Sequence, residues 1–300
     1  MNTITAPTET SYEVVINSIK EDLPSLPKIL EELIKRLSDV DSSLESIREL
    51  IEIDQAIASR VVKVSNKFEF LEPDEPAITT IHDALHKIGL ENAKRISLNV
   101  SVLNLMQNVD FPSTFRFSFL WQHSLGVAVA SAVLSDFTGY ENPDQAYTSG
   151  LVHDLGKLIK IQFNQEAFCR EIHAAQKNRT SLSEFESEAN LIKHDKLGHL
   201  VMEFWQMPVE LSMVAKWHHE QEREKRSGID SPELHHLIDL VCLANLLVHK
   251  LEIGNSGHGV KKDPSPQMLE SLSLCEEKLD EIGSKVLDIY EESSSFLCTL

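Results

Sequence analysis

Glycine and proline are scarce in this sequence, with 11 of each among 300 residues. An architecture of many short strands needs tight turns, and these two residues form many of them. Their scarcity therefore argues against a turn-rich β protein. Leucine, isoleucine, glutamate, serine and alanine dominate instead, and this composition favours helices. We expect an all-α fold.

Basic residues are also few. The chain has 28 lysines and arginines against 47 aspartates and glutamates, for a formal net charge of −19. A surface this acidic repels phosphate backbones, so we expect no general nucleic-acid binding. A small anion could still bind where a metal ion or a local lysine reverses the sign of the field. A nucleotide ligand is therefore expected only at such a site.

Paired cysteines are absent as well. The four cysteines show no Cys-x-x-Cys spacing and are Cys169, Cys242, Cys275 and Cys298. They are typical of free thiols in a reducing compartment. Residues 1–11 lack the basic and apolar regions of a secretory signal peptide. Both observations predict a cytoplasmic protein.

Charged residues are missing from the stretch between Phe117 and Ser135. This stretch is long enough to cross a membrane, but it contains Gln122, His123 and several serines, and no second span accompanies it. We therefore interpret it as a helix buried in the core of a soluble protein, and we expect no membrane contact.

Helical periodicity divides the chain at Pro112 and at a glycine-rich segment. We expect two helical subdomains, with the catalytic candidates in the C-terminal one. The expected organisation is a ragged lead-in (1–20), an N-terminal helical subdomain (21–111), a metal-site subdomain (112–253), a flexible connector (254–264), and a C-terminal amphipathic helix with a tail (265–300).

Local patterns predict several helix boundaries in the C-terminal part. One helix is expected from Asp144 to about Phe163, and one long helix over about 265–292. Ser183 and Glu186 have the spacing of a capping box, which predicts a helix beginning at Ser183.

The most informative segment runs from Leu151 to Lys157. His153 and Asp154 place an imidazole and a carboxylate side by side in apolar surroundings, which supplies two ligand types for one divalent ion. If Asp154 begins or lies in a helix, Lys157 at i+3 falls on the same face and could reach an anion held by that ion. A buried histidine followed by a structural Asp–Lys helix pair would have the same sequence, so this motif alone does not distinguish that arrangement from a metal site.

Further histidines stand at helix centres or ends, namely His123, His194, His218 and His219. A single histidine on an apolar face is usually a satisfied core residue. Several beside one aspartate are harder to explain by packing, because every buried imidazole needs a partner. A shared divalent ion would satisfy several at once. The i,i+4 pair His82 and His86 has no third ligand nearby and is interpreted as ordinary surface residues.

In this order the residues resemble the HD phosphohydrolase superfamily, whose core is a histidine, a His-Asp doublet and a distant aspartate on helices. The chain is more closely similar to the HDOD family, a helical bacterial signalling branch related to HD-GYP, over roughly 23–253. The motifs that carry the resemblance are Leu23-Pro-Ser-Leu-Pro27, Ile78-Thr-Thr-Ile81 leading into Gly89-Leu90, Gly150-Leu-Val-His-Asp-Leu-Gly156, His194-Asp-Lys-Leu-Gly198, Phe204-Trp-Gln-Met-Pro208 and Trp217-His-His219. The resemblance implies that the C-terminal subdomain is an HD-like helical bundle.

The resemblance also implies a metal site with unequal halves. His194, His218 and His219 resemble the added ligands of the HD-GYP phosphodiesterases, which cleave cyclic dinucleotides with two metals, and with Asp154 they would complete one inner shell. The other half would hold His123, His153 and the second oxygen of Asp154.

The second half departs from the superfamily at position 245. Asn245, a neutral amide, stands where the superfamily has its last aspartate. Asp239 does not replace it, because six residues turn a helix by about 600° and the two side chains face different ways. The Gly-Tyr-Pro signature of the HD-GYP group is also absent. The resemblance therefore supports metal binding more than turnover.

Three hypotheses follow. The first is a bacterial signal-transduction HDOD module that binds metal and lacks strong catalysis. The second is a metal-dependent phosphohydrolase or phosphodiesterase acting on a nucleotide or cyclic dinucleotide, with Asp154 and Lys157 as catalytic residues and Lys157 steadying a phosphoryl oxygen. The third is a scaffold whose histidines fill the core.

The first two hypotheses imply a divalent ion, with one or two per chain, and Fe, Mn, Zn or Ni suit the ligand types. The signalling hypothesis also implies a protein partner, because no receiver, kinase or output domain is recognisable in these 300 residues. We expect a monomer or a homodimer.

Overall fold

The computed structural model describes residues 12, 14–15, 17, 28–37, 43–67, 70, 75–107 and 109–297, and over these residues it contains helices and no strand. The predicted all-α fold is therefore confirmed. Two compact units make up the chain: unit 1 is Met1–Pro24 with Val109–Glu291, and unit 2 is Ser25–Asn108 with Glu292–Leu300.

Unit 2 contains α2 (Lys28–Leu37), α3 (Leu44–Ile53), α4 (Gln55–Ser65) and α5 (Ile81–Gln107). Side-chain caps begin two of these helices, because Ser43 accepts a hydrogen bond from Ser46 N–H and Asp54 accepts from Ile57 N–H. Their apolar faces meet in one core. Gly89 has a positive φ of 78° and interrupts α5.

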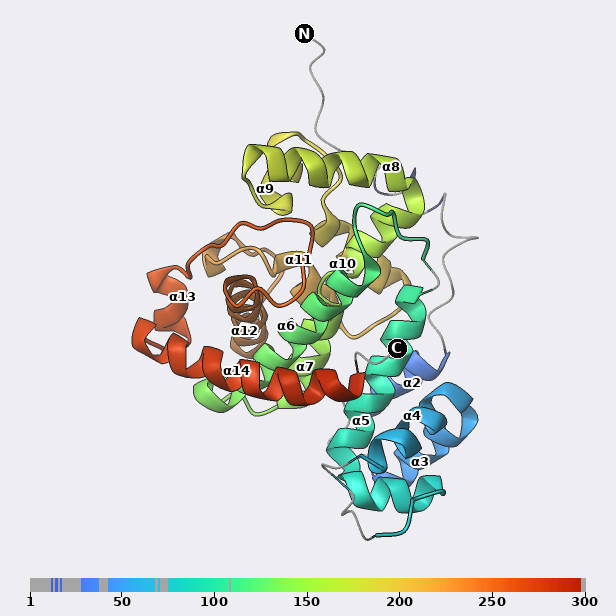
Figure 1. Ribbon diagram of the computed structural model, residues 1–300. Coiled ribbons are helices and arrows are strands. Elements are labelled where there is room, and N and C mark those ends of the chain that lie inside the picture. The colour runs from blue at the N-terminus through green and yellow to red at the C-terminus, as the bar shows by residue number, and fades with distance from the viewer. Residues whose placement is uncertain are drawn as a thin grey trace. The chain divides into compact units, whose positions relative to one another are not determined.

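Unit 1 holds the remaining helices, drawn from green to red in Figure 1, except that α14 beyond Glu291 belongs to unit 2. They are α6 (Phe117–Thr138), α7 (Pro143–Val152), α8 (Leu155–Asn178), α9 (Leu182–Glu188), α10 (His194–Phe204), α11 (Val209–Trp217), the 3-10 helix η1 (Arg223–Lys225), α12 (Pro232–Lys250), α13 (Pro266–Ser271) and α14 (Glu276–Leu297).

Helix α6 is the core element of unit 1 and packs against α7 and α12. By length and composition α6 could cross a membrane, but 72% of its most apolar window is buried inside the protein. The core helix of a soluble protein passes the same test, so this single helix is weak evidence for a membrane span. Its burial also places His123 inside the unit, where the residue is 1% exposed.

The sequence predicts one continuous helix over 144–163, but the structure has two helices there, α7 and α8, separated by a turn. His153 and Asp154 lie in the turn between them. The predicted end near Phe163 corresponds to a second interruption, because Asn164 within α8 has non-helical backbone angles. The turn brings the His-Asp doublet to the end of one helix and the start of the next.

Two further boundaries differ from the prediction. The capping box of α9 is formed by Ser181 and Glu184, not by Ser183 and Glu186, because the same Ser-x-x-Glu spacing occurs twice in this segment. The helix predicted over about 265–292 is divided into α13 and α14.

Part of the predicted lead-in belongs to unit 1. Tyr12 and Val15 are buried in a cluster with residues of α8 and α10, and the Lys193 N–H donates to the Tyr12 hydroxyl at 3.1 Å. The motif Leu23-Pro-Ser-Leu-Pro27 lies outside the described residues.

Candidate metal centre

Asp154 lies at the centre of the predicted cluster. It is the N-cap residue of α8, but its side chain makes no capping hydrogen bond. The residue is 3% exposed. Both carboxylate oxygens are therefore available to groups on other helices.

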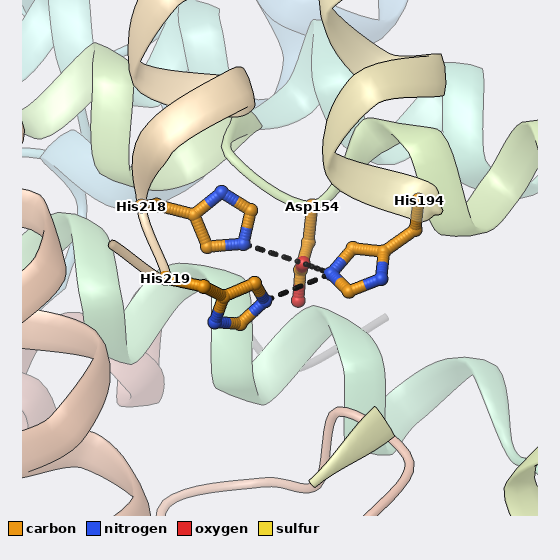
Figure 2. Close-up of side chains that lie close together, drawn as sticks. All are labelled: Asp154, His194, His218 and His219. Atoms are coloured by element: carbon orange, nitrogen blue, oxygen red, sulfur yellow. Dashed lines mark hydrogen bonds and ion pairs between the residues drawn. The ribbon is translucent and has the colours of Figure 1, made fainter. Parts of the chain in front are cut away.

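Oδ1 of Asp154 faces three histidines. His194 Nε2 and His218 Nε2 each lie 3.5 Å from it, and His219 Nε2 lies 2.9 Å from His194 Nε2. Figure 2 shows the imidazoles gathered around this carboxylate, from the start of α10 and the end of α11. Potential ligand atoms of the four residues all lie within 4.8 Å of one another. Asp154 Oδ1 and these histidines are named the three-histidine half.

Oδ2 of Asp154 faces the other predicted ligands. His153 Nε2 lies 3.3 Å away and His123 Nε2 3.8 Å away. Lys157 Nζ donates to the same oxygen at 2.6 Å. Burial alone would raise the pKa of Asp154, but His153 and Lys157 hold that pKa well below its ordinary value of 3.8. His123, His153 and Oδ2 are named the two-histidine half.

Hydrogen bonds at Nδ1 fix how two of these imidazoles are turned. His218 Nδ1 lies 2.8 Å from the Ala215 carbonyl oxygen, and His153 Nδ1 lies 2.7 Å from the Gly150 carbonyl oxygen. A carbonyl oxygen only accepts, so each Nδ1 donates its proton. Each Nε2 then presents a lone pair towards Asp154.

Asn245 lies on α12 and is 4% exposed. Its Oδ1 has no hydrogen-bond partner in the described structure. Asp239 does not take its place, because its carboxylate pairs with Arg223 at 2.5 Å and Arg226 at 2.6 Å. The structure thus agrees with the helical geometry that separates Asp239 from Asn245.

Three of the imidazoles, those of His123, His218 and His219, have pKa values that favour the neutral form. Burial lowers the pKa of His123 well below 6.5, and the neighbouring His249 lowers it further. Burial also lowers the pKa values of His218 and His219. Neutral imidazoles and an ionised carboxylate are the protonation states that bind metal ions.

Unpartnered polar atoms test whether these residues fit a metal ion. His123 Nε2, His153 Nε2 and His218 Nε2 are buried without a hydrogen-bond partner, as is Asp154 Oδ1. Leaving such atoms unsatisfied costs about 1–3 kcal/mol each. A divalent ion would use the same lone pairs, so the residues fit such an ion.

Sequence reasoning missed the residue that orients His194. Glu186 Oε2 lies 2.7 Å from His194 Nδ1 and also accepts from the His194 backbone N–H at 3.1 Å. Lys160 Nζ donates to Glu186 Oε1 at 2.6 Å and also pairs with Glu171. Glu186 is fully buried. Only the fold shows this role, since the spacing suggested a cap.

Two more histidines join the site from α12 and the loop after it. The His249 ring lies 4.8 Å from that of His123 and 4.3 Å from that of His258, centroid to centroid. His249 is one helical turn beyond Asn245, so its i+4 position could have revealed it. His258 lies in the predicted connector, where Asn255 N–H donates to the Phe119 carbonyl.

A pocket of about 330 Å³ opens beside the three-histidine half. Three lysines contribute to its wall, together with acidic residues, Trp217 and Asn245. These lysines are Lys193, Lys216 and Lys262. Two of them already pair with carboxylates, Lys193 with Asp195 and Lys262 with Glu184. The pocket can therefore admit a small anion without being strongly basic.

His82 and His86 lie on α5 in unit 2, with ring centroids 4.5 Å apart. They are exposed, and among the described residues they belong to no group with three potential metal ligands.

The chain matches a known protein family. A model of the HDOD domain matches residues 23–221. A curated relative, an uncharacterized protein of Treponema pallidum, is 22% identical over 248 residues, which cover 77% of this chain. The chain spans 43% of the length of that relative.

Solved structures share the fold. An HDOD domain protein of unknown function from Geobacter sulfurreducens superposes with a TM-score of 0.76 at 21% identity, over 96% of this chain and 98% of that one. A protein from Marinobacter aquaeolei VT8, named as a proposed signal transduction protein, gives 0.76 at 16% identity, over 99% and 68%. A proposed phosphohydrolase from Shewanella amazonensis SB2B superposes with a TM-score of 0.66 at 18% identity, over 94% of this chain and 98% of that one.

Proposed function

This chain belongs to the HDOD domain family, and we propose that it is a bacterial signal-transduction module that binds a divalent metal ion and lacks strong catalysis. The observation that carries the proposal is the three-histidine half. Its imidazoles surround one carboxylate oxygen of Asp154, with all ligand atoms within 4.8 Å of one another. Three nitrogens and one oxygen fill the shell of a four-coordinate ion such as Zn²⁺, and they leave positions for water on an ion that takes six ligands.

Fe, Mn, Zn and Ni all suit imidazole and carboxylate ligands. A bound ion would supply Lewis acidity and would lower the pKa of a coordinated water. The protein supports this site by fixing the rings, since His218 and His194 donate Nδ1 protons to Ala215 and Glu186. Such outer partners stiffen a site that must report the presence of an ion.

The two-histidine half supports the proposal that the chain lacks strong catalysis. A second metal would find His123, His153 and Oδ2 of Asp154, and position 245, where the superfamily has its last aspartate, holds a neutral amide. Lys157 donates to Asp154, so its ammonium is not free to serve a substrate phosphate alone. Two-metal phosphoester cleavage needs both ions to clamp the attacking and leaving oxygens.

The proposal includes a signalling protein as partner, acting on a monomer or homodimer in the cytoplasm. The name of the Marinobacter relative supports a signalling role. The net charge of −19 argues against nucleic acid as the partner. Cys169, Cys242 and Cys275 are free thiols, as a reducing compartment would keep them.

A second candidate function is phosphohydrolysis of a nucleotide, favoured by the pocket beside the site. Its volume of about 330 Å³ lies near the lower end of small-molecule sites, which span about 300–1,000 Å³. This size suits one nucleotide better than a cyclic dinucleotide. In this function Lys157 would donate to a phosphoryl oxygen while Asp154 holds the ion. The Shewanella protein named as a proposed phosphohydrolase supports this candidate.

Metal content of two variants tests the metal site. His218→Ala removes a nitrogen from the three-histidine half and should lower metal content at least about tenfold. His123→Ala should leave it near the wild-type value. The two histidines are matched controls, since each is 1% exposed. Elemental analysis of untagged protein gives the measurement. Loss of metal from His123→Ala but not from His218→Ala would show that the ion is assigned to the wrong half.

A phosphoester screen with Mn²⁺ or Fe²⁺ then separates the two functions. The signalling proposal expects no brisk hydrolysis of nucleotides or cyclic dinucleotides by metal-loaded wild-type protein. Brisk hydrolysis that is lost in His218→Ala would establish the phosphohydrolase function instead.

A further inference from the structure

Lys157 differs from every other lysine of the described chain for which burial is given in how completely it is enclosed. It is 1% exposed and ranks among the largest fully buried side chains. Its ammonium donates to Oδ2 of Asp154 at 2.6 Å. A buried ammonium without a counterion is strongly disfavoured, so this pair is fixed in place.

The oxygen that Lys157 contacts is the one that faces the two-histidine half. His153 Nε2 and His123 Nε2 lie 3.3 and 3.8 Å from Oδ2. Oδ1, by contrast, faces His194 and His218. The ammonium therefore contacts the carboxylate oxygen that a second metal ion would use.

Charge balance leads to the same position. The two-histidine half contains one carboxylate oxygen and two imidazoles, and position 245 on α12 offers only a neutral amide. The nearest acid on α12, Asp239, is fully buried and pairs with Arg223 and Arg226. Once Lys157 has neutralised Asp154, no further negative charge in this half offsets a divalent ion. The Lys157 ammonium and a second divalent ion, both positive and both held at Asp154 in a buried site, would repel each other strongly.

We infer that Lys157 is an internal cation that fills the position of the second metal ion and limits the chain to one divalent ion. The inference rests on the proposed function, since it takes the three-histidine half to be the site of the first ion. It adds a role that an Asp–Lys helix pair would not have, because the lysine then decides the number of metals.

The role is specific to charge and place. Lys160, one turn further along α8, is also buried, but its ammonium serves Glu186 and Glu171. The two buried lysines lie three residues apart on α8 and pair with different acids. Lys160 supports a ligand, whereas Lys157 takes the place of an ion.

Metal stoichiometry in four proteins tests the inference. Wild type and Lys157→Arg, which keeps the charge, should each hold about one Mn²⁺ per chain after dialysis against excess Mn²⁺. Asn245→Asp adds a carboxylate and should raise second-ion occupancy only in part. Lys157→Met with Asn245→Asp should hold about two, because the ammonium is gone and a charged oxygen has replaced the amide.

The possible results separate this inference from the proposed function. About one ion in both Asn245→Asp and the double variant would overturn the inference and leave the metal site standing. No ion in any of the proteins would overturn both. Circular dichroism of each variant checks that it is folded.

A second measurement uses the unaltered chain, in case the double variant does not fold. Crystals of wild-type protein grown with excess Mn²⁺ should show one anomalous peak, among His194, His218 and His219. A second peak between His123 and His153, with Lys157 turned away from Asp154, would overturn the inference.

Discussion

The Glu186 carboxylate accepts from both the backbone N–H and Nδ1 of His194. Because a carboxylate only accepts, the proton of His194 must reside on Nδ1, and Nε2 is left for the cluster. Burial alone would raise the pKa of Glu186, but His194 and Lys160 lower it to about 2. Glu186 is thus ionised at neutral pH and sets the direction of one candidate ligand.

Glu186→Gln should weaken metal binding by about 10–100-fold, the usual effect of removing an outer partner of a ligating histidine. The physical reason is that an amide no longer selects one His194 tautomer. Glu184→Gln is a matched control on the same helix, because glutamine also serves in the capping box that Glu184 forms with Ser181. Isothermal titration of both variants with Mn²⁺ gives the affinities. Equal affinities would remove Glu186 from the site.

Residues whose chemistry is local were predictable from the sequence. The His153-Asp154 doublet and the i+3 position of Lys157 are fixed by a few residues of chain, and the structure brings them together. Glu186 was not predictable, because its partner depends on how the loop after α9 returns to α10. His258 was missed for a similar reason: a glycine-rich stretch suggests a connector, and only the packing of the loop brings the ring to His249.

At the scale of helices, α8 and α10 approach each other through glycine. A Cβ on Gly156 would lie 1.9 Å from the His194 carbonyl oxygen and 2.7 Å from the Gly198 backbone nitrogen. Gly198 stands opposite, where a Cβ would lie 3.2 Å from the Gly156 nitrogen. The first turn of α8, with Asp154 before it, therefore meets the first turns of α10, which carry His194.

Gly156→Ala should destabilise unit 1 by about 1–3 kcal/mol, since the added methyl forces two backbones apart. It should also weaken metal binding, because the displaced backbone carries His194. Gly259→Ala is the control, as a Cβ there meets nothing within 4 Å. Urea unfolding and metal titration measure the two effects. A Gly156→Ala protein with unchanged stability would show that α8 and α10 are less closely packed than described.

Helix existence was easier to predict than helix ends. The lack of charged residues between Phe117 and Ser135 indicated the buried helix α6. The break between α7 and α8 was missed, because no proline or glycine marks the chain at His153 and Asp154. Tertiary packing imposes this turn, and the same turn places both residues in the cluster.

At the scale of the molecule, each unit has its own core, and the tryptophans all belong to one of them. Trp121, Trp205 and Trp217 lie within Val109–Glu291 of unit 1, and the chain has 3 in total. Tryptophan fluorescence therefore reports on the unit that carries the histidine cluster. This allows the stability of unit 1 to be followed without assuming that both units unfold together.

Metal-free unit 1 should lose stability as pH falls below about 6.5, the pH at which histidines in the unfolded chain take up protons. Burial lowers the pKa of His249 to about 4 and that of His258 to about 2. These pKa values are depressed in the folded state, so their contribution is fully present above about 6.5 and is lost progressively as pH falls towards the folded values. For each histidine that stays neutral in the folded protein, the free energy of unfolding should fall by up to about 1.4 kcal/mol per pH unit below 6.5.

Urea titrations followed by tryptophan fluorescence, with a chelator present and pH stepped from about 7.5 to 5, measure this slope. His258→Gln should flatten it, because one depressed histidine is removed. His82→Gln, at an exposed position in unit 2, should leave it unchanged. A stability that stays constant over this range would mean that the buried imidazoles accept protons in the folded protein as easily as in the unfolded chain. They would then lie in a wetter cluster than the one described.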